Sequence, residues 1–284
     1  MKKLLIAILT LLVTISSASA TVREGHLAYS QMTVEEYDKF FSDSFANADD
    51  YVWLDYKIDK PEYAPYLPTL AEYQDFSSFV DMLMALDTSK IDRMELPQPV
   101  AEYFFKLAGN REKYIPYIIT KGVTYYMSMG FKENSKWFVP FNETIKAMAQ
   151  DKTLLSLKVQ YVMDADENPE PVKFDKFPDA ETVKIAITGD MPPIDYIASN
   201  GTPAGFNTAM LAEIARHLKI NVELVSINTG ARASALASGR ADGVFWFWYD
   251  NSTKIPRDVP TGVSLTEPYY SWDTLVYVGK KLHK

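Results

Sequence analysis

The chain has 284 residues, 47% of them hydrophobic, and a formal net charge of −8. The length suits about two domains, and the acidic balance argues against nucleic acid or an anionic membrane surface as a partner. There is no cysteine, which excludes disulfides, thiolate metal ligands, cysteine nucleophiles and a lipid-attachment cysteine.

Residues 1–20 have the pattern of a secretory signal peptide. Lys2 and Lys3 precede an apolar run over residues 4–15, and Ala18 to Ala20 supplies the small residues of a cleavage site. The run is shorter than the ~20 apolar residues of a membrane-spanning helix. We predict cleavage after Ala20 and a periplasmic protein with no lipid anchor.

The first half of the remaining chain, residues 21–130, shows strand and helix patterns around an irregular insertion at residues 46–72. Thr33 and Glu36 form the S/T-x-x-E pattern of a capping box, which opens a predicted helix through Phe41. Apolar spacing predicts the other elements: strands over residues 26–30 and 94–96, and helices over 79–86 and 100–107.

An Asp-, Glu- and Pro-rich segment, residues 164–178, is expected to connect the two halves. The second half, residues 181–284, alternates strand and helix patterns, in the order β-α-β-α-β. This order favours a mainly parallel sheet with right-handed crossovers. The predicted strands cover residues 183–187, 220–224 and 244–248, and the predicted helices cover 206–218 and 231–238.

An internal repeat links the two halves. Residues 85–92 match residues 235–242 without a gap, in the pattern A-L-x-[ST]-[SG]-[KR]-x-D. Each copy follows an apolar helix pattern and precedes an apolar strand pattern, so that a helix ends near a basic residue and a strand begins at the Asp. The repeat predicts two lobes built on one plan, with ligands bound where strand ends face each other across a hinged cleft.

Several segments together resemble the family 3 extracellular solute-binding proteins, the amino-acid-type receptors of ABC importers. Residues 183–193, 205–215, 235–242 and 266–270 resemble the family's first lobe. Residues 27–37, the strand at 122–131 and the closing helices at 137–162 resemble its second lobe. The resemblance implies an α/β fold of the type II periplasmic-binding-protein class, with two lobes joined by a hinge.

The lobe order is reversed relative to the family, because the segment resembling the first lobe comes last. We interpret this as a circular permutation, with new termini where a crossover strand ran from Lys280 into residue 22. One covalent hinge strand would then be missing, and a homodimer could steady closure. Alternatively, the chain is an exchangeable portion of a head-to-tail assembly.

Candidate ligand contacts in the last lobe begin at Asp190, which follows the predicted strand at 183–187. It could accept from a ligand ammonium with Met191 and Ile194 lining the pocket, or it could simply cap a turn. Trp246 and Trp248 alternate with Phe245 and Phe247. The two tryptophans are therefore expected on one face of the predicted strand and the two phenylalanines on the other. The two tryptophans either line the pocket or pack in the core.

The basic residue that would hold a ligand carboxylate is ambiguous. The resemblance implies an Arg in a T-x-x-R setting, where this chain has Lys254 and a displaced Arg257. We prefer Arg232 near the start of a short helix, against the alternative of a solvated surface arginine.

The other lobe offers Thr33, which matches a hydroxyl of the family near a helix N-terminus. The family's ammonium-binding Asp falls near Pro97 and is absent, so Glu95 or Gln98 would have to replace it. Tyr270 is expected on the hinge side of the cleft or in the core.

The expected function is capture of a small polar solute, an amino acid or related compound, for a membrane permease, with no cofactor, metal or nucleic acid. The alternatives are a periplasmic sensor for a membrane receptor or a dehydratase-like enzyme, in which Asp190 or Asp195 would act as acid or base. No H-E-x-x-H, G-x-S-x-G or Walker pattern occurs, so that hydrolysis and phosphoryl transfer have no support.

Overall fold

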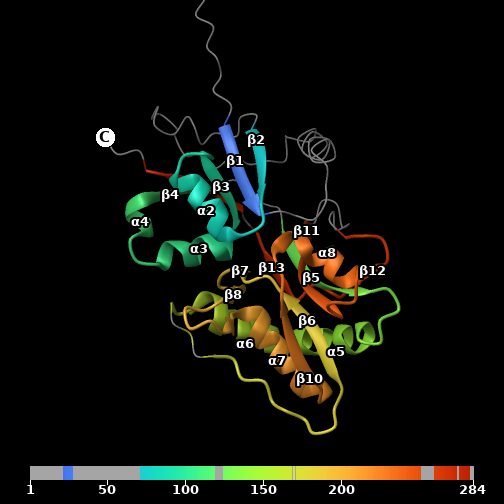
Figure 1. Ribbon diagram of the computed structural model, residues 1–284. Helices are drawn as coiled ribbons and strands as arrows, with labels where there is room; N and C mark the ends of the chain where they lie inside the picture. Colours follow the sequence, from blue (N-terminus) through green and yellow to red (C-terminus); the bar gives the residue numbers. More distant parts are fainter. Residues whose placement is uncertain are drawn as a thin grey trace, which may run out of the picture.

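The computed structural model describes residues 22–27, 71–118, 124–167, 169, 171–250, 259–273 and 275–281. Two α/β lobes lie one above the other (Figure 1). Lobe A contains a five-stranded sheet with helices α2 to α4, and lobe B contains a six-stranded sheet with helices α5 to α8. No helix in these ranges is long and apolar enough to span a membrane.

Lobe A has the strand order β2-β1-β3-β14-β4. Strands β1 and β2 are parallel, as are β1 and β3, whereas β14 runs antiparallel to both of its neighbours. The strands are β1 (Val22–Leu27), β2 (Ala71–Phe76), β3 (Arg93–Pro97), β4 (Tyr114–Ile118) and β14 (Leu275–Lys280), and the helices are α2 (Phe79–Asp87), α3 (Gln98–Lys106) and α4 (Asn110–Lys113).

Lobe B repeats this order with β10-β6-β11-β5-β12, in which β5 is antiparallel to both of its neighbours. Strand β13 also pairs with β5, and β7, β8 and β9 form a small separate sheet. The strands are β5 (Tyr125–Lys132), β6 (Thr182–Ile187), β7 (Asp190–Met191), β8 (Asp195–Ile197), β9 (Pro203–Ala204), β10 (Asn221–Ser226), β11 (Gly243–Asp250), β12 (Val263–Leu265) and β13 (Tyr270–Trp272).

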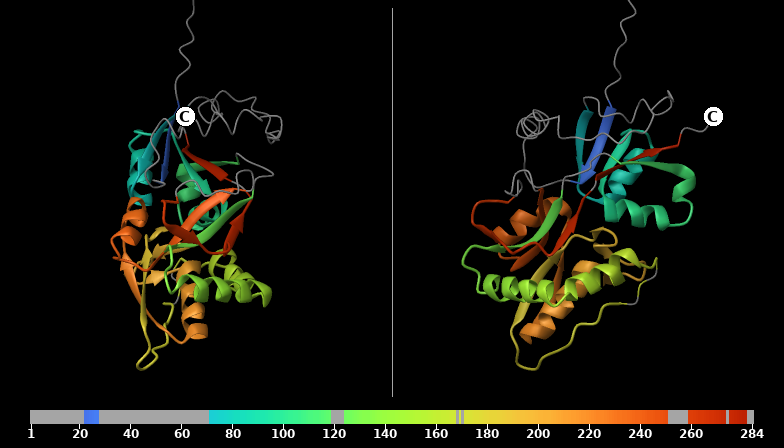
Figure 2. Two further views of the ribbon diagram at one scale, coloured as in Figure 1. Left: turned by 90° about the vertical axis from the view of Figure 1, so that its right-hand side faces the viewer. Right: turned by 180° about the vertical axis from the view of Figure 1, so that it is seen from behind.

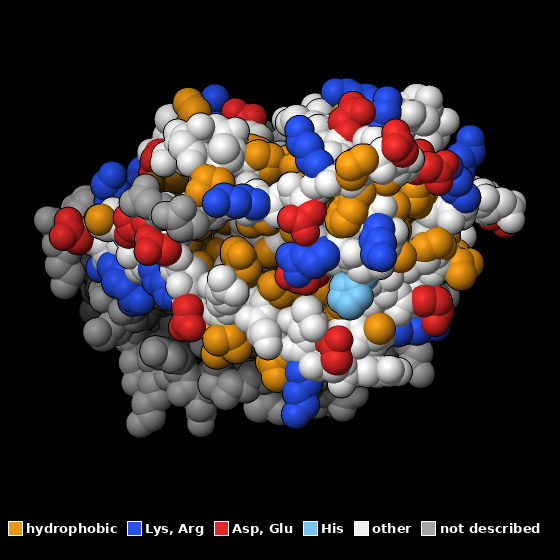
Figure 3. Space-filling model, turned by 90° about the horizontal axis from the view of Figure 1, so that it is seen from below, with side chains coloured by type: hydrophobic (Ala, Val, Ile, Leu, Met, Phe, Trp, Pro, Cys, Tyr) orange, Lys and Arg blue, Asp and Glu red, His pale blue; other side chains and the backbone are white. Residues whose placement is uncertain are grey.

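Helices surround the lobe B sheet, and Figure 2 shows α5 and α7 on its outer side, away from lobe A. The helices are α5 (Phe138–Gln150), α6 (Thr153–Lys158), η3 (Val159–Met163), α7 (Phe206–Leu218), η4 (Thr229–Ala231) and α8 (Arg232–Ala237). Seen from below, Lys and Arg, Asp and Glu, and apolar side chains are interspersed, so that no single sign of charge dominates this face (Figure 3).

Each sheet contains one strand from the part of the chain that otherwise forms the other lobe. Strand β5 follows the lobe A elements in sequence but lies in the lobe B sheet, and β14 follows the lobe B elements but lies between β3 and β4 in lobe A. The expectation that one hinge strand is missing is therefore wrong. Residues 270–280 themselves cross between the lobes, because β13 pairs in lobe B and β14 pairs in lobe A.

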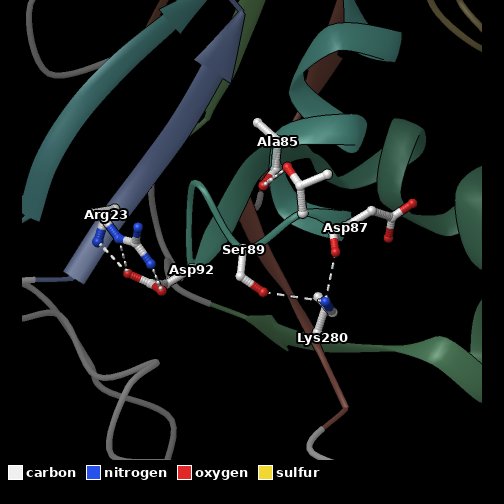
Figure 4. A network of polar contacts seen from close by, with 7 residues as sticks. Arg23, Ala85, Asp87, Ser89, Asp92 and Lys280 are labelled. Atoms are coloured by element: carbon white, nitrogen blue, oxygen red, sulfur yellow. Dashed lines mark hydrogen bonds and ion pairs between the residues drawn. The ribbon is translucent and has the colours of Figure 1, made fainter.

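The repeat takes the same conformation in both lobes, which confirms the shared plan. Ser89 and Gly239 have φ values of 56° and 72°, and both lie just after a helix. The Asp that ends each copy exchanges backbone and side-chain hydrogen bonds with the neighbouring parallel strand: Asp92 with Arg23 of β1, and Asp242 with Lys184 of β6. In lobe A, Lys280 adds bonds to Asp87 O and Ser89 Oγ (Figure 4).

Most predicted elements lie within two residues of the observed ones, one predicted strand differs, and some observed strands, such as β2, are not predicted. The strand predicted over residues 26–30 begins earlier, as β1, because Val22–Leu27 pairs with β2 along its whole length. Strand β2 is not predicted, since its sequence lacks an apolar run. The predicted helix at residues 33–41 and nearly all of the predicted insertion at 46–72 lie outside the described residues.

Candidate ligand-binding site

The carboxyl ends of the parallel strands of both sheets meet between the lobes, and Asp190 lies where they touch. Its Oδ2 accepts a hydrogen bond from Thr229 Oγ1 at 3.0 Å within lobe B. Its Oδ1 accepts from the backbone N–H of Phe79, the first residue of α2 in lobe A, at 3.4 Å. A helix N-terminus presents unpaired N–H groups and partial positive charge, so a carboxylate is well placed there.

Burial raises the pKa of the Asp190 carboxyl, and nearby Asp81 adds to the increase, while the bonds from Thr229 and Phe79 act in the opposite direction. Lobe B thus places one carboxylate directly against lobe A. A second contact lies beside it, where the rings of Tyr103 on α3 and Tyr196 on β8 are 6.0 Å apart. The described lobes are therefore in contact, and a single cluster of buried apolar side chains includes residues of both.

Trp246 is completely enclosed in lobe B. Its indole N–H lies 3.0 Å from Thr188 Oγ1 and 3.2 Å from Asp195 Oδ2, and 1% of the residue is exposed. Its backbone N–H donates to the Tyr269 hydroxyl at 3.1 Å. Its φ of 48° is in the left-handed region, which is rare for a bulky residue.

The left-handed residue accompanies a register shift between Val244 and Phe247, and this shift overturns the expected alternation. Phe245 belongs to the main core cluster and Phe247 to a smaller one, so the two phenylalanines do not share a face. Trp248 is half-buried, and its ring packs at 5.5 Å from Tyr125 and 5.8 Å from Trp272.

Arg232 is buried rather than solvated, so the surface alternative is wrong. Its Nε donates to Thr229 O at 3.1 Å and one terminal nitrogen donates to Trp246 O at 2.6 Å. Its guanidinium lies 4.2 Å from the centre of the Trp246 ring, a cation–π distance. Thr229 therefore joins Arg232, through its carbonyl, to Asp190, through its hydroxyl.

The other predicted contacts are more dispersed. Met191 and Ile194 are buried in the main core cluster. Gln98 begins α3 in lobe A, and its amide donates to Glu102 at 2.7 Å. Thr33, Lys254 and Arg257 lie outside the described residues. The ligand-contact roles of all these residues stay predictions.

Tyr270 lies on the wall of a pocket of about 190 Å³ on the hinge side of lobe B, between α6, the start of α7 and β13. Lys158 lies beside it, with Nζ 4.6 Å from the ring centre and donating to Ser271 O at 2.9 Å. Burial lowers the pKa of Lys158. The sequence did not indicate this lysine, because Lys158 and Tyr270 come together only where α6 packs on β13.

Lobe A contains a second group of buried charges, of which the sequence indicated only Glu95, as a candidate ligand contact. Glu24 on β1 and Arg93 on β3 form an ion pair of 2.5 Å, and the Arg93 guanidinium lies 3.8 Å from the centre of the Tyr277 ring. Burial, with Glu24 close by, raises the pKa of Glu95 to about 8. In the described ranges, no group of three or more His, Asp or Glu side chains could hold a metal ion.

The family model for bacterial extracellular solute-binding proteins, family 3, matches residues 183–283. The match confirms the resemblance of this segment, and the mixed α/β lobes have the predicted type II periplasmic-binding-protein fold. A comparison with curated proteins gives no match.

Among solved structures, the chain is similar to the ligand-binding component of an ABC-type import system from Staphylococcus aureus, at 11% identity and a TM-score of 0.44. The similarity covers 92% of this chain and 66% of the other, slightly under two thirds of its length. An ancestral arginine-binding protein gives 12% identity, a TM-score of 0.39 and coverages of 92% and 84%. The oxidised form of OxyR gives 11% identity, a TM-score of 0.41, and coverages of 92% of this chain and 86% of the other.

Proposed function

Because residues 183–283 match the family 3 extracellular solute-binding proteins, we propose that the chain captures a small polar solute between its lobes and delivers it to an ABC importer. It performs no covalent chemistry in this proposal. The observation that carries the proposal is the contact of Asp190 with the first turn of α2, since it closes lobe B on lobe A where the two sheets' carboxyl edges meet.

Asp190 is also the solute contact that we propose, as the acceptor for a ligand ammonium or guanidinium. Its carboxylate has two oxygens with about four acceptor positions, of which Thr229 and Phe79 take two. A cation bound there would be held by a group that already joins both lobes. Gln98, at the carboxyl end of β3, would add a polar contact from lobe A.

The remaining parts of the proposal concern location and assembly. We infer export with cleavage after Ala20, a membrane permease or sensor as a partner, and a circularly permuted lobe order. The strand exchange supports the last point, because both lobes keep the same sheet order although the segment matching the family comes last. Homodimer formation stays a prediction.

Thermal denaturation of residues 21–284 against amines, amino acids and small acids tests the proposal. A solute at 100 times its Kd adds about 2.7 kcal/mol of stability, which is a clear rise in Tm. We expect Asp190→Ala to abolish that rise and Asp179→Ala, an exposed carboxylate, to retain it.

Small-angle scattering gives a second readout of the same contact. Ligand-free Asp190→Ala should have a larger radius of gyration than the parent, because the carboxylate no longer joins the lobes. A full panel without any rise in Tm, or a solute response that survives Asp190→Ala unchanged, would contradict the proposal.

A further inference from the structure

The most unusual feature of lobe B is that a tryptophan of its own strand fills the space between its buried charged groups. Trp246 has the Arg232 guanidinium 4.2 Å from its ring centre and both Thr188 and Asp195 at its indole N–H. The ring is thus held as a protein holds a flat aromatic ligand, by an apolar enclosure with a few polar groups that fix its orientation.

The backbone of Trp246 supports this interpretation independently of the ring contacts. A left-handed conformation is unfavourable for an aromatic residue and persists only where the surroundings impose it. Here the backbone N–H donates to Tyr269 and the carbonyl accepts from Arg232, so both peptide groups that flank the side chain are fixed. The register shift beside it turns the ring inward.

We propose that Trp246 is a built-in occupant of a lobe B pocket, which would otherwise accept a flat heteroaromatic ring with an N–H donor. While the indole is in place, Asp195 is enclosed and at least two donors of Arg232 are bonded to backbone carbonyls. Trp246 therefore sets specificity, because it keeps a solute carboxylate away from Arg232.

A consequence follows for the solute, and it rests on the proposed function. Asp190 is joined to this pocket through Thr229 but lies at the contact between the lobes, outside the indole enclosure. A solute in the cleft then meets the Asp190 carboxylate and no accessible Arg232. Cations that lack a carboxylate are expected to bind better than the amino acids from which they differ by that group.

The decisive variant is Trp246→Gly, since glycine adopts a φ of 48° without strain and leaves the ring's space empty. We expect indole to raise the Tm of this variant saturably and to leave the parent unchanged. Benzofuran, which has the same shape but no N–H, should give a smaller rise than indole. Trp248→Gly, which removes a half-buried ring from the same strand, serves as the control and should respond little to either probe.

A measurement on the parent protein keeps the inference testable if Trp246→Gly does not fold. With ¹⁵N-labelled tryptophan, the Trp246 indole N–H should be assignable by its loss in Trp246→Phe and should exchange with solvent far more slowly than that of Trp248. Absence of an indole response in a folded Trp246→Gly variant, or fast exchange in the parent, would overturn the inference.

The consequence for specificity has its own matched pairs: agmatine with arginine, and cadaverine with lysine. We expect the amine of each pair to raise the Tm of the parent more than the amino acid does. If indole enters Trp246→Gly but no solute affects the parent, the built-in occupant stands and the proposed function fails. If the parent binds both members equally, the specificity role of Trp246 is wrong while solute capture stands.

Discussion

At the scale of single residues, burial decides which side chains take part in a site. The sequence offered Asp195 only as a candidate acid or base; in the structure it is fully buried and lies against Thr188 and the Trp246 indole. Burial raises its pKa to about 6, although the hydrogen bonds from Thr188 and Trp246 act in the opposite direction. The charged form is therefore unfavourable in the folded protein.

This pKa predicts a pH dependence of stability. A carboxyl whose folded pKa lies above its unfolded value of 3.8 stabilises the fold below that value, and the contribution is lost as pH rises through about 6. Denaturant unfolding of the parent and of Asp195→Asn between pH 4 and pH 8 should show the parent losing stability relative to the variant as pH rises. A difference that does not change with pH would contradict the buried carboxyl.

The sequence located these residues only in part, and the reason is physical. It placed Asp190 after a strand and Arg232 at a helix start correctly, because periodicity and the fold plan determine those positions, but Trp246 lies in the middle of β11 rather than at its end. It could not show that Arg232 is buried, since that depends on a register shift in β11 that moves Trp246 into the lobe. One extra residue in a strand is not visible in an apolar run.

At the scale of elements, the repeat is the strongest case for sequence-based prediction. The same spacing gives the same turn because the left-handed residue after each helix and the Asp at each strand start are both fixed by local hydrogen bonds. At the left-handed position the two copies have different residues, Ser89 in one lobe and Gly239 in the other. Glycine adopts this conformation without the steric penalty that serine incurs.

The two turns therefore predict opposite effects of substitution. Ser89→Gly should stabilise lobe A by up to ~1 kcal/mol, reduced by its lost 3.3 Å contact with Lys280. Gly239→Ala should destabilise lobe B by about 1 kcal/mol through conformation alone, because an added Cβ at Gly239 meets no atom within 4 Å. Urea unfolding measures both. Changes of the same sign would contradict the equivalence of the turns.

Strands β1 and β3, together with Asp92 just before β3, carry two arginine–carboxylate pairs that differ in burial. Arg93 with Glu24 is almost completely buried, whereas the side chains of Arg23 and Asp92 are 44% and 30% exposed. Arg93→Met leaves Glu24 and Glu95 buried without their cation and should cost roughly 3–5 kcal/mol. Arg23→Met, the matched control, should cost ~1 kcal/mol or less. Equal costs in urea unfolding would contradict the assigned burial.

At the scale of the whole molecule, the strand exchange explains how two lobes in reversed order keep one fold. The exchanged strand takes the same place in each sheet order: β14 lies between β3 and β4, and β5 lies between β11 and β12. The chain therefore crosses between the lobes at both β5 and β14. The sequence predicted the first crossing through the resemblance. It missed the second because residues 275–280 look like an end, although their pairing with β3 and β4 makes them an inner strand.

The last residues of β14 and the first residues of β1 lie close together, at the same end of the lobe A sheet. Gly279 pairs with Arg93, which in turn pairs with Glu24, so two strand spacings of about 4.8 Å separate them. A short Gly-Ser linker from residue 284 to residue 21 would span this distance. New termini between Glu167 and Pro171 would keep the hydrogen bonds that hold the connector on either side of the cut. These are the bonds of Tyr103 with Asp166 and of Asn221 with Phe177.

A chain re-permuted in this way should fold, because every strand pair is kept and loop closure changes stability by only about 1–2 kcal/mol. We expect its circular dichroism spectrum to match that of the parent and its solute response, where the parent has one, to be retained. A control opened between Met127 and Ser128 should fail, since it cuts β5 inside the lobe B sheet, where β5 pairs with β11, β12 and β13. If neither circularly permuted chain folds while the parent does, the chain order is essential to this fold. Permutation then does not account for the reversed order of its lobes.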